Sequence, residues 1–173
     1  FQMTSIWSSL ANALNLIFSL DSNFVHICAV SIRTSLISTM LASLTGLPLD
    51  IIIGTSSFRG KKIVVALINT LFALPTVVVG VFVYCLIFRT GPFGSWELLF
   101  TPAAIVIGQF ILATPIVTAL TIASVEGVDK RLEPTARTLG ANTLQAKMSV
   151  LYESRHAAAA AVAAGFGRVF GEV

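Results

Sequence analysis

Long blocks of apolar residues dominate this sequence, and very few charged side chains interrupt them. Of the 173 residues, 55% are hydrophobic and only 11% are charged, whereas a soluble domain carries about 25% charged residues. So little polar surface cannot cover a globule in water, and a spanning helix needs about 20 mostly apolar residues. The sequence therefore predicts an all-α membrane protein folded as a polytopic helical bundle.

The apolar blocks predict about four spans in a single transmembrane domain, at about 24–53, 63–88, 99–125 and 156–173. The first block is interrupted by Gly46, Leu47 and Pro48. In residues 1–22, apolar side chains recur at helical spacing and polar side chains lie between them, which is typical of an amphipathic helix in the membrane interface. No basic stretch precedes the first block, so no cleavable signal peptide is expected. The start at Phe1 and the apolar end are typical of trimmed ends or of a fragment.

The basic residues predict how the chain lies in the membrane. Three of the 11 Lys and Arg residues fall in the loop 54–62 and five in the loop 126–155. The positive-inside rule places both loops in the cytoplasm and the N-terminus outside. Because the basic residues gather at the edges of apolar blocks, the net charge of +3 indicates contact with a lipid membrane and not with nucleic acid.

The residues that commonly bind metals or catalyse reactions form no recognisable pattern. Cys28 and Cys85 lie inside apolar blocks, and neither has metal-ligand spacing. His26 and His156 are far apart along the chain and are best explained as satisfied or interfacial side chains. We expect no metal site and no catalytic residue in this chain.

Two prolines lie within predicted spans, and each removes a backbone hydrogen bond and kinks its helix. Two interpretations remain for Pro75 and Pro115: a purely structural kink, or part of a pore or gate. Polar residues on the same two helices favour a pathway, because polar groups in hydrocarbon must face other helices or water. These pore and gate candidates are Asn69, Pro75, Thr76, Gln109, Thr114 and Pro115.

Arg168 and Glu172 are spaced four residues apart, so they are expected to pair along one helix. Two interpretations of this pair remain: a structural ion pair, or a role at the pore exit. Arg33 lies close enough to the outer end of its span to extend its charge to the interface.

The connection 126–155 is far longer than a simple turn requires. It predicts two short helices hinged at Gly140, Ala141 and Asn142, with Pro134 in the first turn of the first helix and Asn142 or Thr143 capping the second. Physical reasoning alone allows an interfacial helical hairpin.

The order of residues in this loop carries a family resemblance. The stretch 132–141, Leu-Glu-Pro-Thr-Ala-Arg-Thr-Leu-Gly-Ala, resembles the EAA loop of ABC-importer permeases. The motif's glutamate falls at Pro134, and its Leu-Pro falls at Tyr152-Glu153. The resemblance implies a helix that docks on a separate ATPase subunit through Glu133, Thr135, Ala136, Arg137, Leu139, Gly140 and Ala141. The run 166–172 is similar to a Phe-Ala-Arg-Ala-Leu-Gly-Glu segment of the same families.

Two further stretches resemble oxyanion permeases for molybdate and tungstate, and most closely the tungstate branch. These are 69–80, Asn-Thr-Leu-Phe-Ala-Leu-Pro-Thr-Val-Val-Val-Gly, and 89–94 together with 99–102. Such permeases have about five spans, of which this chain carries about four. The resemblance implies half of a pore in a prokaryotic inner membrane, paired with a second copy and served by an extracytoplasmic substrate-binding protein.

The resemblance also implies that ATP and Mg²⁺ bind in the partner subunit and that this chain binds no cofactor. The sequence agrees, because no P-loop pattern occurs in it. Two alternatives stay open. One is a permease of another ABC importer, for sulfate, phosphate or methionine. The other is a secondary transporter or a membrane scaffold, which would require coupling charges at mid-membrane that the spans 63–88 and 99–125 lack.

Overall fold

The computed structural model describes residues 8–11, 22–56 and 58–172 of the chain. These residues form helices, and no strand occurs among them, which confirms the all-α fold class. The elements are α2 (Ser22–Thr55), α3 (Lys61–Phe72), α4 (Thr76–Ile87), the 3-10 helix η1 (Gly94–Trp96), α5 (Pro102–Glu126), α6 (Leu132–Thr138) and α7 (Thr143–Phe170).

The chain divides into two compact units, Phe1–Arg33 and Thr34–Val173, and the boundary falls within α2. In the first unit, most of the expected interfacial helix over residues 1–22 lies outside the described residues, although residues 8–11 are helical. The account below concerns the second unit.

Two of the described helices, α2 and α5, are long and apolar enough to cross a membrane. The consecutive helices α3 and α4 pass the same test only as a pair, and they are bent by 93° at their junction. The helix α7 is not among the described helices that pass on length and composition. The four membrane boundaries expected from the sequence, including a span over 156–173, therefore stay a prediction.

The prolines act differently from expectation. The helix α2 runs without interruption through Pro48, and α5 runs unbroken through Pro115. Only Pro75 ends a helix: it adopts an extended backbone (φ −61°, ψ 135°) and precedes the first residue of α4. The kink expected at Pro115 stays a prediction: α5 continues through this proline, and the surrounding turns are buried on neighbouring helices, which hold a helix together despite one missing backbone hydrogen bond.

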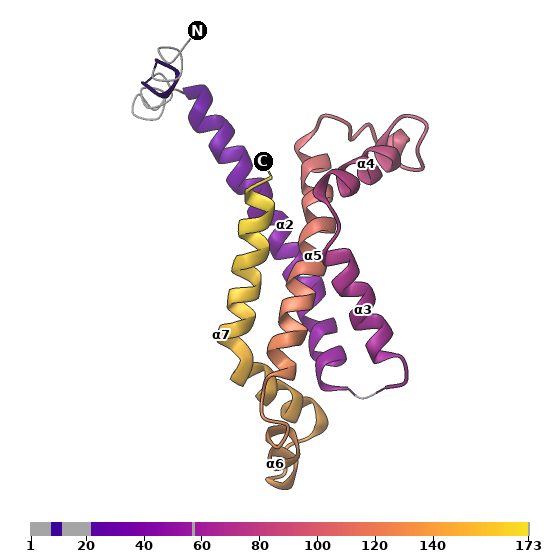
Figure 1. Ribbon diagram of the computed structural model, residues 1–173, viewed down its shortest axis with the longest axis vertical. Helices are drawn as coiled ribbons and strands as arrows, with labels where there is room; N and C mark the ends of the chain where they lie inside the picture. The colour runs from indigo at the N-terminus through magenta and orange to yellow at the C-terminus, as the bar shows by residue number, and fades with distance from the viewer. Residues whose placement is uncertain (1–7, 12–21, 57, 173) are drawn as a thin grey trace. The chain divides into compact units, whose positions relative to one another are not determined.

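The helix α5 lies at the centre of the second unit and packs against α3, α4 and α7. Figure 1 shows α7 along one flank of α5 and α3 along the other. Glycine allows the closest approach: a Cβ atom added at Gly165 on α7 would lie 2.7 Å from Cγ2 of Val117. Small residues at such crossings are typical of membrane helix packing.

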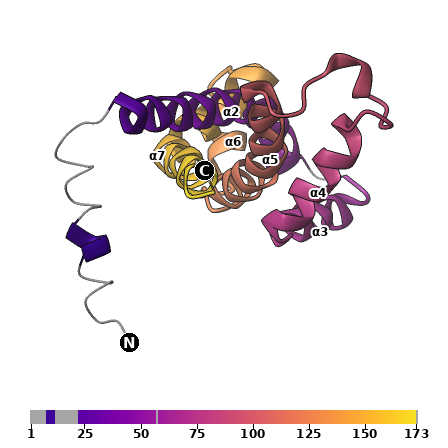
Figure 2. The same ribbon diagram turned by 90° about the horizontal axis from the view of Figure 1, so that it is seen from above.

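A buried amide joins three helices. Gln109 on α5 donates from Nε2 to Ser35 Oγ (3.1 Å) on α2 and to the Val169 carbonyl (3.3 Å) on α7. Its Oε1 accepts from Ser38 Oγ (3.0 Å), also on α2. These three helices lie together in the view from above (Figure 2). The amide thus fixes the rotation of each helix about its own axis.

The contact at Gly165 yields a matched pair of tests. Gly165→Ala places a methyl group against the buried Val117 side chain, and overpacking of this kind costs about 1–3 kcal/mol. Gly167→Ala, two residues along the same helix, meets nothing within 4 Å. We expect a lower melting temperature in lipid nanodiscs for Gly165→Ala and no decrease for Gly167→Ala. Equal melting temperatures for the two variants would contradict the α5–α7 contact.

Candidate functional site

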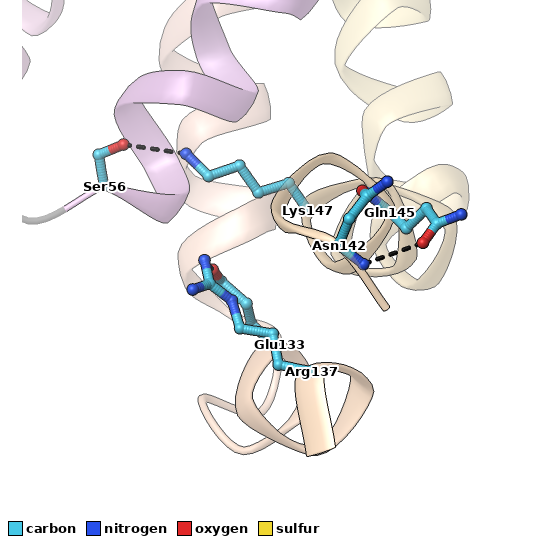
Figure 3. Close-up of polar contacts among 6 residues, drawn as sticks. All are labelled: Ser56, Glu133, Arg137, Asn142, Gln145 and Lys147. Atoms are coloured by element: carbon cyan, nitrogen blue, oxygen red, sulfur yellow. Dashed lines mark hydrogen bonds and ion pairs between the residues drawn. The ribbon is translucent and has the colours of Figure 1, made fainter. Parts of the chain in front are cut away.

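The predicted coupling loop contains a short helix, α6, followed by a tight turn. Glu133 accepts a hydrogen bond from Arg137 (2.7 Å), one helical turn later, so this ion pair lies along the surface of α6 (Figure 3). The turn ends in a left-handed residue, Gly140 (φ 93°), and the Ala141 amide donates to the Ala136 carbonyl (3.0 Å). The turn at Gly140 expected from the sequence is therefore present, and it joins the end of α6 at Thr138 to the start of α7 at Thr143.

The next helix begins with two reciprocal hydrogen bonds. Asn142 Oδ1 accepts from the Gln145 amide (2.8 Å), and Gln145 Oε1 accepts from the Asn142 amide (2.9 Å) (Figure 3). This capping box fixes the start of α7 and confirms Asn142 as the cap. The expected second short helix does not exist as a separate element, because α7 continues from Thr143 to Phe170 without a break. The alanine-rich stretch after His156 favours continuation of the helix.

The turn and the first half of α7 present large apolar side chains to the surroundings. Leu139 is 84% exposed, Leu144 70% and Tyr152 66%, and Met148 is also exposed. We call these four residues the apolar docking face. The smaller residues Thr135 and Ala136 lie on α6, before this turn. Leu144, Met148 and Tyr152 recur every four residues and so share one face of α7, and an exposed apolar face of this kind is a candidate binding surface.

Three polar contacts, made by two lysine side chains, tie this segment and its surroundings to the membrane helices. Lys147 Nζ donates to Ser56 Oγ (3.3 Å), just beyond the end of α2 (Figure 3). Lys61, at the start of α3, pairs with Glu126 at the end of α5 (2.9 Å) and donates to the Gly54 carbonyl (2.9 Å) on α2. The sequence did not predict these contacts, because Lys147–Ser56 and Lys61–Glu126 join residues far apart along the chain and Lys61–Gly54 joins two different helices.

A cavity of 590 Å³ lies beside these contacts. Its charged lining residues are three carboxylates and two ammonium groups: Glu126, Asp129, Glu133, Lys61 and Lys130. An oxyanion requires an excess of donors and positive charge. The cavity lining has the opposite balance, so it does not fit an oxyanion site.

The pore and gate candidates are spread over three helices. Asn69 is exposed on α3, and Pro75 and Thr76 lie at the bend before α4. Thr114 is half-buried and donates to the Phe110 carbonyl (2.7 Å), as is typical of threonine in a membrane helix. Gln109 is buried, and all its contacts described above are internal. Among the described residues, Gln109 makes no hydrogen bond to Asn69 or Thr76, so their role in a pathway stays a prediction.

The last candidate pair forms as expected. Arg168 and Glu172, four residues apart near the end of α7, make a salt bridge. Arg168 precedes Val169, whose carbonyl accepts from Gln109. Both residues are exposed. The structure therefore shows the ion pair, and its role at a pore exit stays a prediction.

Residues 46–173 match the family model described as the binding-protein-dependent transport system inner membrane component. The chain belongs to this family. The match covers the last ten residues of α2 and every later element, including α6, the Gly140 turn and α7. The family assignment and the docking geometry thus concern the same part of the chain.

Several proteins with similar sequences are named as transporter permeases. A probable anion ABC transporter permease protein of Haloferax volcanii is 36% identical over 86% of this chain and 64% of its own length. The tungstate uptake system permease protein TupB of Campylobacter jejuni is 36% identical over 97% of this chain and 70% of its own. TupB of Peptoclostridium acidaminophilum is 32% identical over 93% and 71%. The chain spans about two thirds of the length of these relatives.

The left-handed turn of this permease-family chain gives a second matched test. Gly140→Ala places a Cβ atom at φ 93°, which costs about 1–2 kcal/mol in the left-handed region, although the space around it is open. Gly127→Ala keeps a right-handed residue (φ −76°), which alanine adopts without strain. We expect faster limited proteolysis near residues 139–142 for Gly140→Ala only. Faster cleavage in both variants would count against a special role for the Gly140 backbone.

Proposed function

We propose that the chain is the pore-forming permease subunit of an ATP-driven ABC importer for tungstate or molybdate. Two copies would pair in the inner membrane, and a separate ATPase subunit would bind ATP and Mg²⁺. An extracytoplasmic binding protein would deliver the anion. The observation that carries the proposal is the compact α6–turn–α7 segment, which exposes an apolar docking face and is bonded directly to the membrane helices.

The coupling step is supported by the continuity of α7. This helix has 28 residues and is therefore about 42 Å long at 1.5 Å per residue. Its first turns carry the docking face, and its later turns pack on α5 and accept the Gln109 hydrogen bond. A movement of the docked ATPase would therefore reach the centre of the bundle through one rigid element.

The contacts of Lys147 and Lys61 provide a second route. The Lys147–Ser56 bond connects α7 to the end of α2, and Lys61 connects α2, α3 and α5 at the same end of the second unit. Displacement of α6 and α7 would pull on three helices together. Such a joint displacement is what an alternating-access pore requires.

The orientation is supported by the position of the two basic loops. Ser56 and Lys61 belong to the loop 54–62, and Glu126 and Lys147 belong to the region 126–155, so the bonds between them bring the two loops to one end. The positive-inside rule requires both loops to lie on the same side of the membrane. We therefore propose that both face the cytoplasm and that the N-terminus lies outside.

The anion is proposed from the relatives, two of which are named as tungstate permeases. The cavity near Glu126 does not fit an oxyanion, and the residues 102–125 of α5 carry no charge. These observations favour selection of the anion mainly by the binding protein, with the permease supplying a path through the membrane.

The docking role predicts a specific loss of ATPase binding. Leu139→Asp places a charge on the most exposed residue of the apolar docking face, and loss of a hot-spot contact costs about 2 kcal/mol or more, so we expect at least about tenfold weaker binding of the ATPase subunit. Phe58→Asp is the matched control, because Phe58 is an exposed apolar residue of the other basic loop. Quantitative pull-down of the ATPase subunit from nanodiscs measures both. Unchanged affinity of the Leu139→Asp variant for the ATPase subunit would contradict the docking role.

The transport role predicts uptake by the reconstituted complex. Proteoliposomes that contain the full-length permease, its ATPase and its binding protein should accumulate tungstate when ATP is supplied, and a nonhydrolysable ATP analogue should abolish accumulation. An excess of molybdate should compete, whereas sulfate and methionine should not. ATP-driven uptake of sulfate or methionine instead would keep the permease role and overturn the proposed anion. Accumulation without ATP would overturn the importer mechanism.

A further inference from the structure

One acidic residue of α2 lies in the interior of the bundle without a partner. Asp50 is 0% exposed, and neither of its carboxyl oxygens has a hydrogen-bond partner among the described residues. It is the only charged residue of α2 between Thr34 and Thr55. Sequence reasoning missed it, although a single acidic residue within an apolar block is itself a signal of function.

The neighbours of Asp50 come from α5. A Cβ atom added at Gly46 would lie 3.1 Å from Thr118 Oγ1 and 3.5 Å from Asp50 Oδ2, so both oxygens border the space beside Gly46. About two turns further along each helix, a Cβ atom at Gly54 would lie 2.7 Å from Val125. The contacts advance in the same direction along both helices, so the two helices are parallel here, and by residue number Asp50 and Thr121 each fall about midway between the two contacts.

The hydroxyl group of Thr121 is also buried and also lacks a partner among the described residues. The interface between α2 and α5 therefore contains a carboxyl group and two threonine hydroxyl groups, Thr118 and Thr121, in an apolar environment. Buried polar groups in native proteins are nearly always satisfied, so such a cluster requires an explanation.

The charged groups of the surrounding helices are engaged elsewhere. On α5 the only ionisable residue is Glu126, which pairs with Lys61 of α3 at 2.9 Å. Lys62 of α3 is exposed. On α7, Lys147 donates to Ser56, Arg155 lies over the Tyr152 ring, and Glu153 and His156 are exposed. No salt bridge in the described part of the chain neutralises Asp50.

We infer that Asp50 is a proton-binding site within the α2–α5 interface, closed by Thr118 and Thr121. An isolated carboxylate in an apolar interior is so unfavourable that the group binds a proton instead. The protonated carboxyl group donates its O–H to one of the threonine oxygens. When α2 and α5 separate, water reaches Asp50, the O–H bond breaks, and the carboxylate and a free proton result.

A metal ion explains the cluster less well than a proton. Hard cations require about six oxygen ligands, whereas this cluster offers one carboxyl group and two hydroxyl groups. The described residues also contain no group of three or more His, Cys, Asp or Glu side chains that could hold a metal. A proton needs a single oxygen and fits the closed space.

Infrared difference spectroscopy of the full-length protein in lipid nanodiscs tests the site without any transport assay. At neutral pH, the spectrum of the native protein minus that of Asp50→Asn should show the C=O band of a protonated carboxyl group, shifted in D₂O. Asp129→Asn is the matched control, because Asp129 is exposed in the loop after α5, and it should keep the band. Asp50→Glu should keep a protonated band at a different frequency, which preserves the test if Asp50→Asn fails to fold.

Three outcomes decide the inference. A band that disappears only in Asp50→Asn and shifts in Asp50→Glu supports it. Absence of any protonated band from native protein at neutral pH overturns it, because Asp50 is then ionised. Loss of the band on addition of NaCl or KCl at constant pH also overturns it, because the ligand is then a cation. The inference is independent of the proposed transport function, so either can fail alone.

Discussion

The amide of Gln109 is the contact on which the arrangement of the second unit depends. Hydrogen bonds within hydrocarbon have no competition from water, and apolar side chains give little preference for one helix rotation over another in a lipid environment. Gln109 bonds to two serines of α2 and to a carbonyl of α7, so it sets which faces of three helices meet. The close approach of Gly165 to Val117 and of Gly54 to Val125 depends on that rotation. Small residues then allow the helices to pack closely. An apolar helix face without Gln109 would not specify which faces meet.

The fold class and the coupling segment were accessible from the sequence because each depends on local information. Apolar length predicts helices, Gly140 and Asn142 mark a turn and a cap, and Arg168 with Glu172 are spaced for one helical turn. The effect of the prolines was not accessible. Pro75 and Pro115 have similar sequence surroundings, yet only Pro75 ends a helix, because the turns around Pro115 are buried against neighbouring helices.

Contacts between segments far apart along the chain could not be predicted from local sequence patterns either. The roles of Lys61 and Lys147 depend on which helix ends meet, and the isolation of Asp50 depends on which face of α5 is opposite α2. The sequence also suggested that Gln109 faces a pathway, because a polar residue in a span must face water or another helix. The structure places it against other helices. The same physical requirement permits both environments, and only tertiary packing distinguishes them.

The right-angled junction at Pro75 has a consequence for the lipid around the protein. The helices α3 and α4 have 12 residues each, so each rises about 18 Å. The two helices alone, at about a right angle, extend at most about 25 Å in any one direction, whereas the hydrocarbon core is about 30 Å thick. A straight helix of the same residues would exceed that thickness. Where the pair forms one span, its helices are therefore shorter than the hydrocarbon core, and the resulting hydrophobic mismatch would thin the bilayer beside it.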